Sequence, residues 1–414
     1  MVRGAPTLTR MTDTDAEDVK ARIEAEVDRL ADVLLEVSHD IHAHPEVLFE
    51  ERHAHDVLTQ VLEDQGLAVE RRAYGLETGF AARAGTEGPL VAVCCEYDAL
   101  PGIGHACGHN VIAAAGLGAG LAAAHVAAEL GGQVLILGTP GEEGGGGKQL
   151  MMDAGALEGV DAALMVHPAG VDLRTMDTLA IQRCTVTYSG HAAHASAAPE
   201  KGRNALDAMV LGYVNVAALR QHITPDERIH GIFLEGGHAA NIVPARTVAQ
   251  WYVRSPSRDG LAVLRDRVET CLRAGADASA CEIAFDWYDP AYDELVGLDS
   301  FDDLYVANAG RVGRTPLRSG DDGVPSVLGS TDMGNVSQVV PSIHPMIAVS
   351  PPDIAIHTED FVRFAGGPEG DAAVLDGAKA LACTIADLWL DPAALARIHA
   401  EFADRTGHRV PGTE

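Results

Sequence analysis

Three short apolar runs decide the fold of this chain: Leu90-Val-Ala-Val-Cys-Cys95, Gln133-Val-Leu-Ile-Leu-Gly138 and Ala162-Ala-Leu-Met-Val166. Each run has the length of a strand, and continuous apolar composition is typical of strands buried on both faces of a parallel sheet. Helix-like segments separate the runs, one starting near residue 111 and one over residues 149–154. This alternation of strand and helix predicts an α/β fold built on a doubly wound sheet.

Outward from these runs, the pattern is interrupted once. Apolar residues at helical spacing predict an opening helical segment over residues 16–66, and a helix over residues 372–390 ends the chain's pattern. Near Cys184 the rhythm changes to strands at 185–189, 228–235, 247–254 and 282–287, with helices at 204–219 and 261–274. We therefore expect a small α+β domain of residues 184–289, inserted into a discontinuous domain of residues 1–183 and 290–414.

Composition excludes several classes of function. The 414 residues include 60 acidic and 30 basic side chains, for a net charge of −30, so we expect no basic surface for nucleic acid. The longest apolar segment, residues 111–130, contains His125 and Glu129 and is expected to be a core helix rather than a membrane span. Seven cysteines, with Cys94 and Cys95 adjacent, do not form a secreted disulfide framework, which favours a reducing, cytoplasmic setting.

Potential metal ligands follow all three apolar runs. Ligands bind beyond the carboxyl ends of the strands in an open parallel sheet. After the runs come, in order, Glu96, Asp98, Cys107 and His109; then Glu142 and Glu143; then His167. Thiolate, imidazole and carboxylate are the ligands that Zn²⁺ and its transition-metal neighbours prefer. Taken singly, each has a plainer interpretation as a buried thiol, a helix-start acid pair or a core histidine, but their joint placement predicts a metal site.

Two glycine-rich stretches imitate nucleotide-binding motifs without completing them. Residues 144–148 look like a phosphate loop, but that motif needs glycine where Glu142 stands and serine or threonine where Gln149 stands. Residues 102–104 lack the third glycine of a dinucleotide fingerprint. A nucleotide-binding enzyme is therefore disfavoured.

One histidine cluster lies outside this edge of the sheet and consists of His39, His42 and His44. It stands beside Pro45 and Glu46, at the expected end of the opening helical segment. We interpret it as structural rather than as a metal site.

Several motifs together make the chain resemble a known family. They are Glu96-Tyr-Asp-Ala-Leu-Pro101, Cys107-Gly-His-Asn110, Gly141-Glu-Glu143, the lone His167, Ile356-His-Thr358 and the opening His42-Ala-His-Pro-Glu46. In order and spacing they resemble the dinuclear metallopeptidases of family twenty, which include aminoacylases, hippurate hydrolases and indole-acetyl-amino-acid hydrolases. The similarity covers residues 38–390. With Gly329-Ser-Thr-Asp-Met-Gly-Asn335, it is nearest to the branch of aminobenzoyl-glutamate hydrolase subunits and β-alanyl dipeptidases.

The resemblance implies roles around two divalent ions, Zn²⁺ or Mn²⁺, with Co²⁺ as a further option. It implies that Cys107 bridges the ions and that four ligands are divided between them, His109 and His167 on one, Glu143 and His357 on the other. Glu142 would act as general base, and Asp98 would orient the site. Glu96 stands where relatives outside this branch carry a ligand histidine, and that role would pass to His109.

The inserted domain resembles a lid that also forms a dimer contact. Gly190-His-Ala-Ala-His194 matches the segment whose histidine stabilises the oxyanion, with His194 rather than His191 at the matching position. Weaker candidates for contact with polar groups of the substrate are Asn241, Arg254, Asp332 and Asn335. For each of these the ordinary alternative is a surface, turn or loop-structuring role.

The expected activity is hydrolysis of an amide bond in a small N-acyl amino acid or dipeptide, by a homodimer associated through the lid. Aminoacylase, dipeptidase and carboxypeptidase activities stay open, because all three need an amide, two metals and an anchor for a carboxylate. A non-catalytic metal- or ligand-binding protein on the same fold is disfavoured, because every matched position is filled. Neither nucleic acid nor a membrane is expected as a partner.

Overall fold

The chain forms two compact units in the computed structural model, which describes residues 13–321, 324 and 328–408. Unit 1 comprises Met1–Asp177, Val296–Val327 and Val336–Glu414, and unit 2 comprises Thr178–Leu295 and Leu328–Asn335. The mixed α/β class expected from the sequence is confirmed. Both expected boundaries, 183/184 and 289/290, fall inside unit 2. The reason is that Ile181 and Tyr292 exchange backbone hydrogen bonds of 2.8 and 3.0 Å at the ends of the insert.

Unit 1 is built on a six-stranded sheet with the order β1-β2-β4-β3-β5-β13. The strands are β1 (Val69–Arg71), β2 (Phe80–Ala84), β3 (Leu90–Cys95), β4 (Gln133–Gly138), β5 (Ala162–Leu164) and β13 (Ser342–Ile343). Strands β3, β4, β5 and β13 pair in parallel, whereas β2 is antiparallel to both β4 and β1. The sheet is therefore mixed, with an antiparallel edge that the apolar runs did not indicate. Two further strands, β6 (His167–Ala169) and β14 (Met346–Ala348), form a parallel pair.

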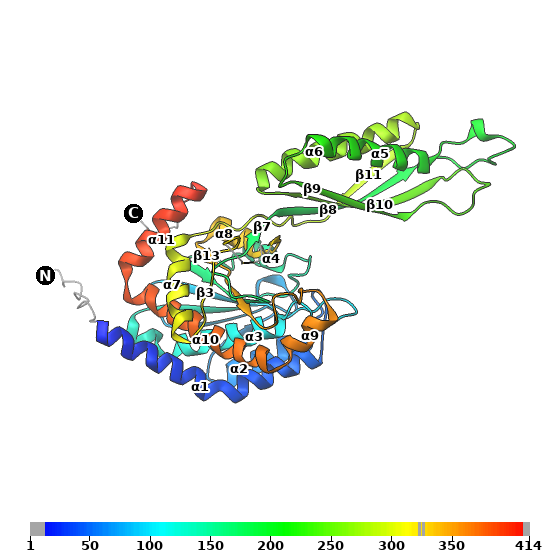
Figure 1. Ribbon diagram of the computed structural model, residues 1–414. Coiled ribbons are helices and arrows are strands. Elements are labelled where there is room, and N and C mark those ends of the chain that lie inside the picture. Colours follow the sequence, from blue (N-terminus) through cyan, green and yellow to red (C-terminus); the bar gives the residue numbers. More distant parts are fainter. Residues whose placement is uncertain (1–12, 322–323, 325–327, 409–414) are drawn as a thin grey trace. The chain divides into compact units, whose positions relative to one another are not determined.

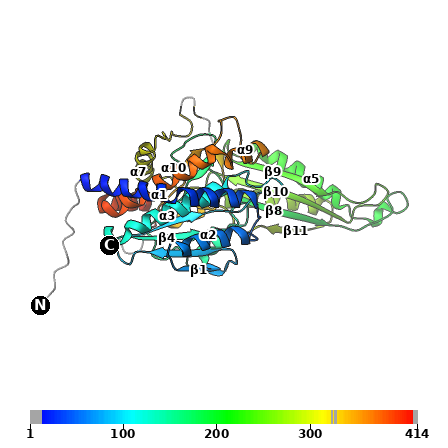
Figure 2. The same cartoon turned by 90° about the horizontal axis from the view of Figure 1, so that it is seen from below.

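Helix α3 (His109–Leu130) is the buried helix of unit 1. Its many alanines and glycines let it lie close to the sheet, and a Cβ added at Gly116 would come within 2.8 Å of the Cys95 sulfur. Helices α1 (Asp13–Ala43) and α10 (Pro368–Leu390) pack beside it in one shared apolar core, as Figures 1 and 2 show. Among the described residues, α3 is the one helix long and apolar enough to span a membrane, and most of it is buried inside the fold.

Six further helices in the part of the chain that the structure describes are shorter than α1, α3 and α10. They are α2 (Arg52–Asp64), α4 (Gly147–Asp153), α7 (Asp299–Arg311), α8 (Met333–Val339), α9 (Glu359–Ala365) and α11 (Pro392–Thr406). A 3-10 turn at Ala73–Gly75 belongs to unit 1, and 3-10 turns at Pro199–Lys201 and Arg220–His222 belong to unit 2. The expectation that the helix over residues 372–390 ends the pattern was wrong, because α11 follows it. The Asp391 side chain accepts the Ala393 N–H, and Pro392 occupies the first turn, so one helix stops and another starts.

Unit 2 is a four-stranded antiparallel sheet with the order β11-β8-β10-β9. Its elements are β8 (Ala180–Ser189), β9 (Arg228–Glu235), β10 (Arg246–Ser255), β11 (Glu282–Trp287), α5 (Ala205–Leu219) and α6 (Arg258–Ala278). Helices α5 and α6 cover one face of this sheet (Figure 1). Short strands β7 (Asp177–Thr178) and β12 (Leu328–Gly329) pair where the unit begins. Within the part of the chain that the structure describes, strand β9 pairs only with β10 and is therefore an edge strand.

Candidate metal centre

One edge of the unit 1 sheet gathers most of the predicted ligands. Because β3, β4 and β5 run in parallel, they end at the same edge, at Cys95, Gly138 and Leu164. The side chains carried to that edge are Glu96 and Asp98 after β3, Cys107 and His109 at the start of α3, Glu142 and Glu143 after β4, His167 at the start of β6, and His357 before α9. These residues are buried, except that Glu143 is half-buried and His357 is exposed.

Two groups of three ligand atoms share the thiol of Cys107. One group contains Cys107, His109 and His167, and the other contains Cys107, Glu143 and His357, each with its ligand atoms within 4.8 Å of one another. The Cys107 Sγ atom lies 3.4 Å from His167 Nε2 and 3.3 Å from His357 Nε2. Ligands bound at about 2.0–2.3 Å around one tetrahedral ion are roughly 3.3–3.8 Å apart. The spacing therefore fits side chains that could hold metal ions.

Three buried polar atoms at this edge support the same interpretation. Within the described residues, His109 Nε2, Glu96 Oε2 and Glu143 Oε1 are buried without a hydrogen-bond partner. His109 Nε2 is 3.5 Å from Glu96 Oε2 and 3.7 Å from Glu143 Oε1. Buried polar atoms normally have partners, and leaving them without one costs free energy. A divalent cation would satisfy such atoms, so the residues present fit a metal.

The outer nitrogens of two histidines are held by oxygen atoms. His109 Nδ1 lies 3.0 Å from Asp98 Oδ1, and His167 Nδ1 lies 2.8 Å from the Pro168 carbonyl oxygen. Each contact places a proton on Nδ1 and turns the Nε2 lone pair toward the ligand cluster. The second oxygen of Asp98 accepts the backbone N–H of Glu143 at 2.9 Å. Asp98 thus orients ligands from two different strand ends.

Two left-handed backbone positions shape the site. Gly108, between Cys107 and His109, has φ of 76°, and a Cβ there would come within 2.9 Å of the Pro168 ring. Only glycine fits this position without strain. His357 has φ of 65°, a conformation uncommon for a residue with a side chain. Its backbone N–H donates to the Ala106 carbonyl at 2.8 Å, which ties the last ligand to the loop of the first.

Burial and neighbouring charges together set the protonation of these side chains in the metal-free protein. Burial lowers the pKa of His167 to about 4, so its imidazole is neutral. Burial also opposes charge on His109, but the Asp98 carboxylate outweighs it and raises the pKa of His109 well above its usual range. Burial, followed by the charge of Glu143, raises the pKa of the Cys107 thiol. Bound cations would displace a proton from the His109 imidazole and from the Cys107 thiol, because metal ligands must be deprotonated.

A further carboxylate, Glu142, lies beside the ligands. Its side chain is buried, and one of its oxygens is within 4.8 Å of the ligand atoms of Glu96 and His109. This position suits a group that exchanges protons with a reactant bound at the cations.

Sequence reasoning missed several residues that support the site. Lys148, considered only as part of a failed phosphate loop, donates to Glu96 Oε1 at 2.5 Å, and both side chains are buried. Glu51 accepts the backbone N–H of Gly141 at 3.0 Å, just before the Glu142–Glu143 pair. His344, by contrast, was expected from the sequence to help shape the pocket, and its buried ring lies 5.3 Å from that of His167. Lys148 could have been noticed in the sequence, because it is a lysine among glycines and apolar residues. No comparable sequence signal marks Glu51.

Unit 2 contains the remaining predicted residues. His194 Nδ1 accepts the backbone N–H groups of Ser196 and Ala197 at 3.3 and 3.2 Å, so the proton of its neutral ring is on Nε2. His194 is exposed. Asn241 lies beside it, because the Asn241 carbonyl accepts the Ala195 N–H at 3.0 Å. These two predicted residues are therefore brought together within unit 2.

The other three predicted substrate contacts are less accessible. Arg254 donates to the Ser330 hydroxyl at 3.0 Å, and burial lowers its pKa. Asp332 is fully buried. The Asn335 amide is engaged with backbone, since its Oδ1 accepts from Asp293 N and its Nδ2 donates to the Ala291 carbonyl. These hydrogen bonds are of the loop-structuring kind that the sequence left as an alternative for Asn335.

The fold and the paired ligand groups define the class of this protein as an α/β protein with a potential metal centre. Residues 92–387 match the family described as Peptidase family M20/M25/M40. The chain is 39% identical to the mouse (Mus musculus) Xaa-Arg dipeptidase over 94% of its own length and 93% of that protein. It is 34% identical to one of the p-aminobenzoyl-glutamate hydrolase subunits of Escherichia coli (strain K12), over 59% of this chain and 55% of that protein.

Solved structures agree in fold. A dinuclear metal-binding peptidase of family M20 from Bacillus subtilis superposes with a TM-score of 0.67 at 19% identity, over 86% of this chain and 98% of that chain. An aminobenzoyl-glutamate utilization protein from Klebsiella pneumoniae gives 0.65 at 20% identity, over 87% and 98%. The chain belongs to the M20/M25/M40 family of peptidases. It is a metallohydrolase that acts on amide bonds, as the sequence predicted.

Proposed function

We propose that this chain hydrolyses small amides at a dinuclear centre in which Cys107 is shared by both cations. The observation that carries this proposal is the pair of overlapping ligand groups, with Glu142 beside them. His109 and His167 would complete one site, and Glu143 and His357 the other. When bound, two divalent ions would polarise the scissile carbonyl and lower the pKa of the attacking water. The mixed sulfur, nitrogen and oxygen ligands suit Zn²⁺ or Mn²⁺, with Co²⁺ as an alternative.

Glu142 acts as the general base in this proposal. It accepts a proton from the attacking water and passes it to the amine that leaves. Asp98 keeps His109 and the Glu143 backbone in place while this happens. Removing a general base typically lowers the rate by about 10²–10⁴-fold, so we expect a loss of this size in kcat for Glu142→Gln.

The matched control for Glu142→Gln is Glu87→Gln, which neutralises an exposed carboxylate in the loop before β3. Both variants should bind as much metal as the wild type, measured by elemental analysis of the purified proteins. Near wild-type hydrolysis by metal-loaded Glu142→Gln would show that the proposed base is wrong.

His194 is proposed to donate a hydrogen bond to the oxyanion. The support is its fixed tautomer, with Nδ1 accepting two backbone N–H groups and Nε2–H directed away from them. Loss of one such donor costs about 10²–10³-fold in kcat, so we expect this for His194→Ala. The control is His191→Ala, an exposed histidine of the same segment. An equal effect of the two substitutions on kcat would reject the assignment.

The preferred substrates are proposed to be dipeptides with a cationic C-terminal residue. The support is the near full-length match to an Xaa-Arg dipeptidase, together with the net charge of −30, whose long-range field favours cationic substrates. Asn241 and Arg254 are the proposed contacts for the polar groups of the substrate, and Asp332 a weaker one. Values of kcat/KM for Xaa-Arg dipeptides, acyl-amino acids, aminobenzoyl-glutamate and β-alanyl dipeptides test the proposal. A preference for aminobenzoyl-glutamate would overturn it and leave the hydrolase assignment intact.

A homodimer through unit 2 completes the proposal. Helix α5 and edge strand β9 expose an apolar surface formed by Val210, Leu211, Tyr213, Val214, Ile232, Phe233 and Leu234. Exposed edge strands and large apolar patches are normally covered, and a second copy can cover both. Light scattering should give a dimer for the wild type and a monomer for Phe233→Asp. The control Val339→Asp changes an exposed residue of α8 and should remain dimeric. A monomeric wild type would rule out this interface.

A reducing, cytoplasmic location is proposed as well. All seven cysteines are free, which is usual for proteins kept in a reducing compartment.

A further inference from the structure

A second group of potential metal ligands lies where the end of α1 meets the start of α2. Asp40 is in the last turn of α1, His44 follows the end of that helix, and His53 is in the first turn of α2. One ligand atom from each of these residues lies within 4.8 Å of the others. None of the three belongs to the catalytic centre described above.

A single carboxylate holds the two imidazoles of this group. Asp40 Oδ1 is 3.0 Å from His44 Nδ1, and Asp40 Oδ2 is 2.9 Å from His53 Nε2. The two imidazole rings have centroids 4.4 Å apart and planes inclined by 50°. Two imidazoles and one carboxylate are a common ligand set for Zn²⁺, with water in the remaining position.

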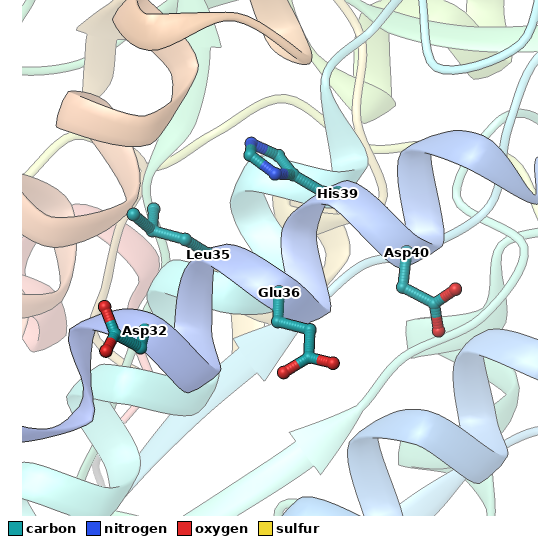
Figure 3. Close-up of a pocket in the computed structure, with 5 residues that line it drawn as sticks. All are labelled: Asp32, Leu35, Glu36, His39 and Asp40. Carbon is teal, nitrogen blue, oxygen red and sulfur yellow. The ribbon is translucent and has the colours of Figure 1, made fainter.

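This group differs from the histidine cluster considered in the sequence. His39 pairs with Asp371 at 2.6 Å, and His42 Nε2 lies 2.9 Å from the Val362 carbonyl oxygen, so both are directed elsewhere. Figure 3 shows His39 on the opposite side of α1 from Asp40. Only His44 of the original three remains, and His53 joins it from the next helix.

The surroundings of the group favour entry of a cation. The side chains of Asp40, His44 and His53 are 33%, 57% and 39% exposed, so solvent can supply further ligands. Glu36 lies one helical turn before Asp40, and Figure 3 shows both carboxylates on the same side of α1. This local negative charge adds to the overall charge of −30, and both attract cations.

The backbone around the group is already held in place. The Glu46 carboxylate accepts the backbone N–H of His53 at 2.8 Å and that of Ala54 at 3.1 Å, which fixes the start of α2. The backbone N–H of His44 donates to the Asp40 carbonyl at 3.1 Å. The three ligands therefore need little reorganisation to bind an ion, and preorganised ligands bind more tightly.

We propose that Asp40, His44 and His53 form a separate cation site that binds Zn²⁺ or a closely related transition-metal ion. The bound ion would connect the end of α1 to the start of α2. It would take no part in the hydrolytic reaction. The competing explanation is a cluster held by hydrogen bonds alone, with the carboxylate of Asp40 between two imidazoles.

The test counts Zn²⁺ ions bound per chain after the full-length protein is stripped of metal and titrated with Zn²⁺. We expect His53→Ala to bind one ion fewer than the wild type, whatever the number in the catalytic centre. The matched control is His39→Ala, which removes another exposed histidine of α1 and should leave the number unchanged. Equal stoichiometry in the wild type and His53→Ala would overturn the proposal.

A second measurement guards against a variant that folds poorly. Hydrolysis by His53→Ala and by His44→Gln should match the wild type, which shows that each variant is folded. Zn²⁺ at one hundred times the Kd of this site should raise the folding equilibrium constant of the wild type about a hundredfold further. In both variants this extra stabilisation should be absent. Its persistence would equally contradict the proposal.

Discussion

Replacing Lys148 by methionine should destabilise unit 1 strongly, although Lys148 is not a proposed ligand. Lys148 Nζ and Glu96 Oε1 are 2.5 Å apart, and the two side chains are 2% and 0% exposed. The substitution Lys148→Met keeps most of the side-chain volume but removes the charge. The Glu96 carboxylate would then be buried without its cation. The other oxygen of Glu96 faces His109 Nε2 at 3.5 Å and cannot reach solvent.

The size of this effect follows from the burial of the pair. Breaking a buried ion pair by removing one partner costs about 3–5 kcal/mol, most of it for the charge left behind. At about 2 °C per kcal/mol for a unit of this size, the melting temperature of metal-free unit 1 should fall by roughly 6–10 °C. An exposed ion pair would be worth only about 0–1 kcal/mol.

Differential scanning calorimetry of the metal-free protein provides the assay. The transition that contains unit 1 should move, and the transition of unit 2 serves as an internal reference. The double variant Lys148→Met/Glu96→Gln removes both charges and should recover most of the loss, which a double-mutant cycle measures directly. A melting temperature within about 1 °C of the wild type, or a double variant no more stable than the single one, would refute the reasoning.

Three further predictions concern other parts of unit 1. Glu51→Ala leaves the donors of Phe49 N, Thr78 Oγ1 and Gly141 N without their acceptor, so stability should fall by about 3–6 kcal/mol and kcat should fall with it. Melting and kinetics check this, and a wild-type kcat would separate Glu51 from the placement of the catalytic loop. Burial raises the pKa of Asp302 to about 7, so the wild type should lose up to about 4 kcal/mol relative to Asp302→Asn as pH rises from 4 to 8. Urea unfolding at both ends of that range measures the difference, and parallel pH profiles of the two proteins would contradict it. Treatment with a chelator should abolish hydrolysis, and added Zn²⁺ or Mn²⁺ should restore it. Hydrolysis that persists after all metal has been removed would contradict this prediction.

Strands with continuous apolar runs could be predicted with accurate limits. Strands β3 and β4 begin and end at the predicted residues, because burial on both faces leaves a continuous apolar run that glycine, proline or polar residues interrupt at each end. The antiparallel hairpin of β1 and β2 was missed. Its strands have three and five residues, of which Glu70 and Arg83 are exposed and polar, so no periodic pattern stands out.

The clustering of the proposed ligands could be predicted from the sequence for a related reason. Parallel strands carry the residues that follow them to one edge, so the order of the strands alone groups Cys107, Glu143 and His167. The supporting residues could not be grouped in this way. Lys148 and Glu96 are 52 positions apart, and their contact depends on how α4 packs rather than on any local pattern. Glu51 is 90 positions from Gly141 and lies before the sheet even begins.

The hydrogen-bonded pair of Ile181 and Tyr292 has a consequence for how the chain is assembled. The two ends of the insert are hydrogen-bonded to one another. For unit 1, the insert is therefore equivalent to a loop whose ends are already close together. Closing this loop costs entropy, and the contacts within the sheet of unit 2, rather than those in the core of unit 1, offset that cost. Such an arrangement makes the insert suitable for exchange as a unit between related proteins. Together with Leu328–Asn335, the second segment of unit 2, it could be exchanged for the corresponding part of a relative, and the two ends of the insert would already be neighbours suited to circular permutation.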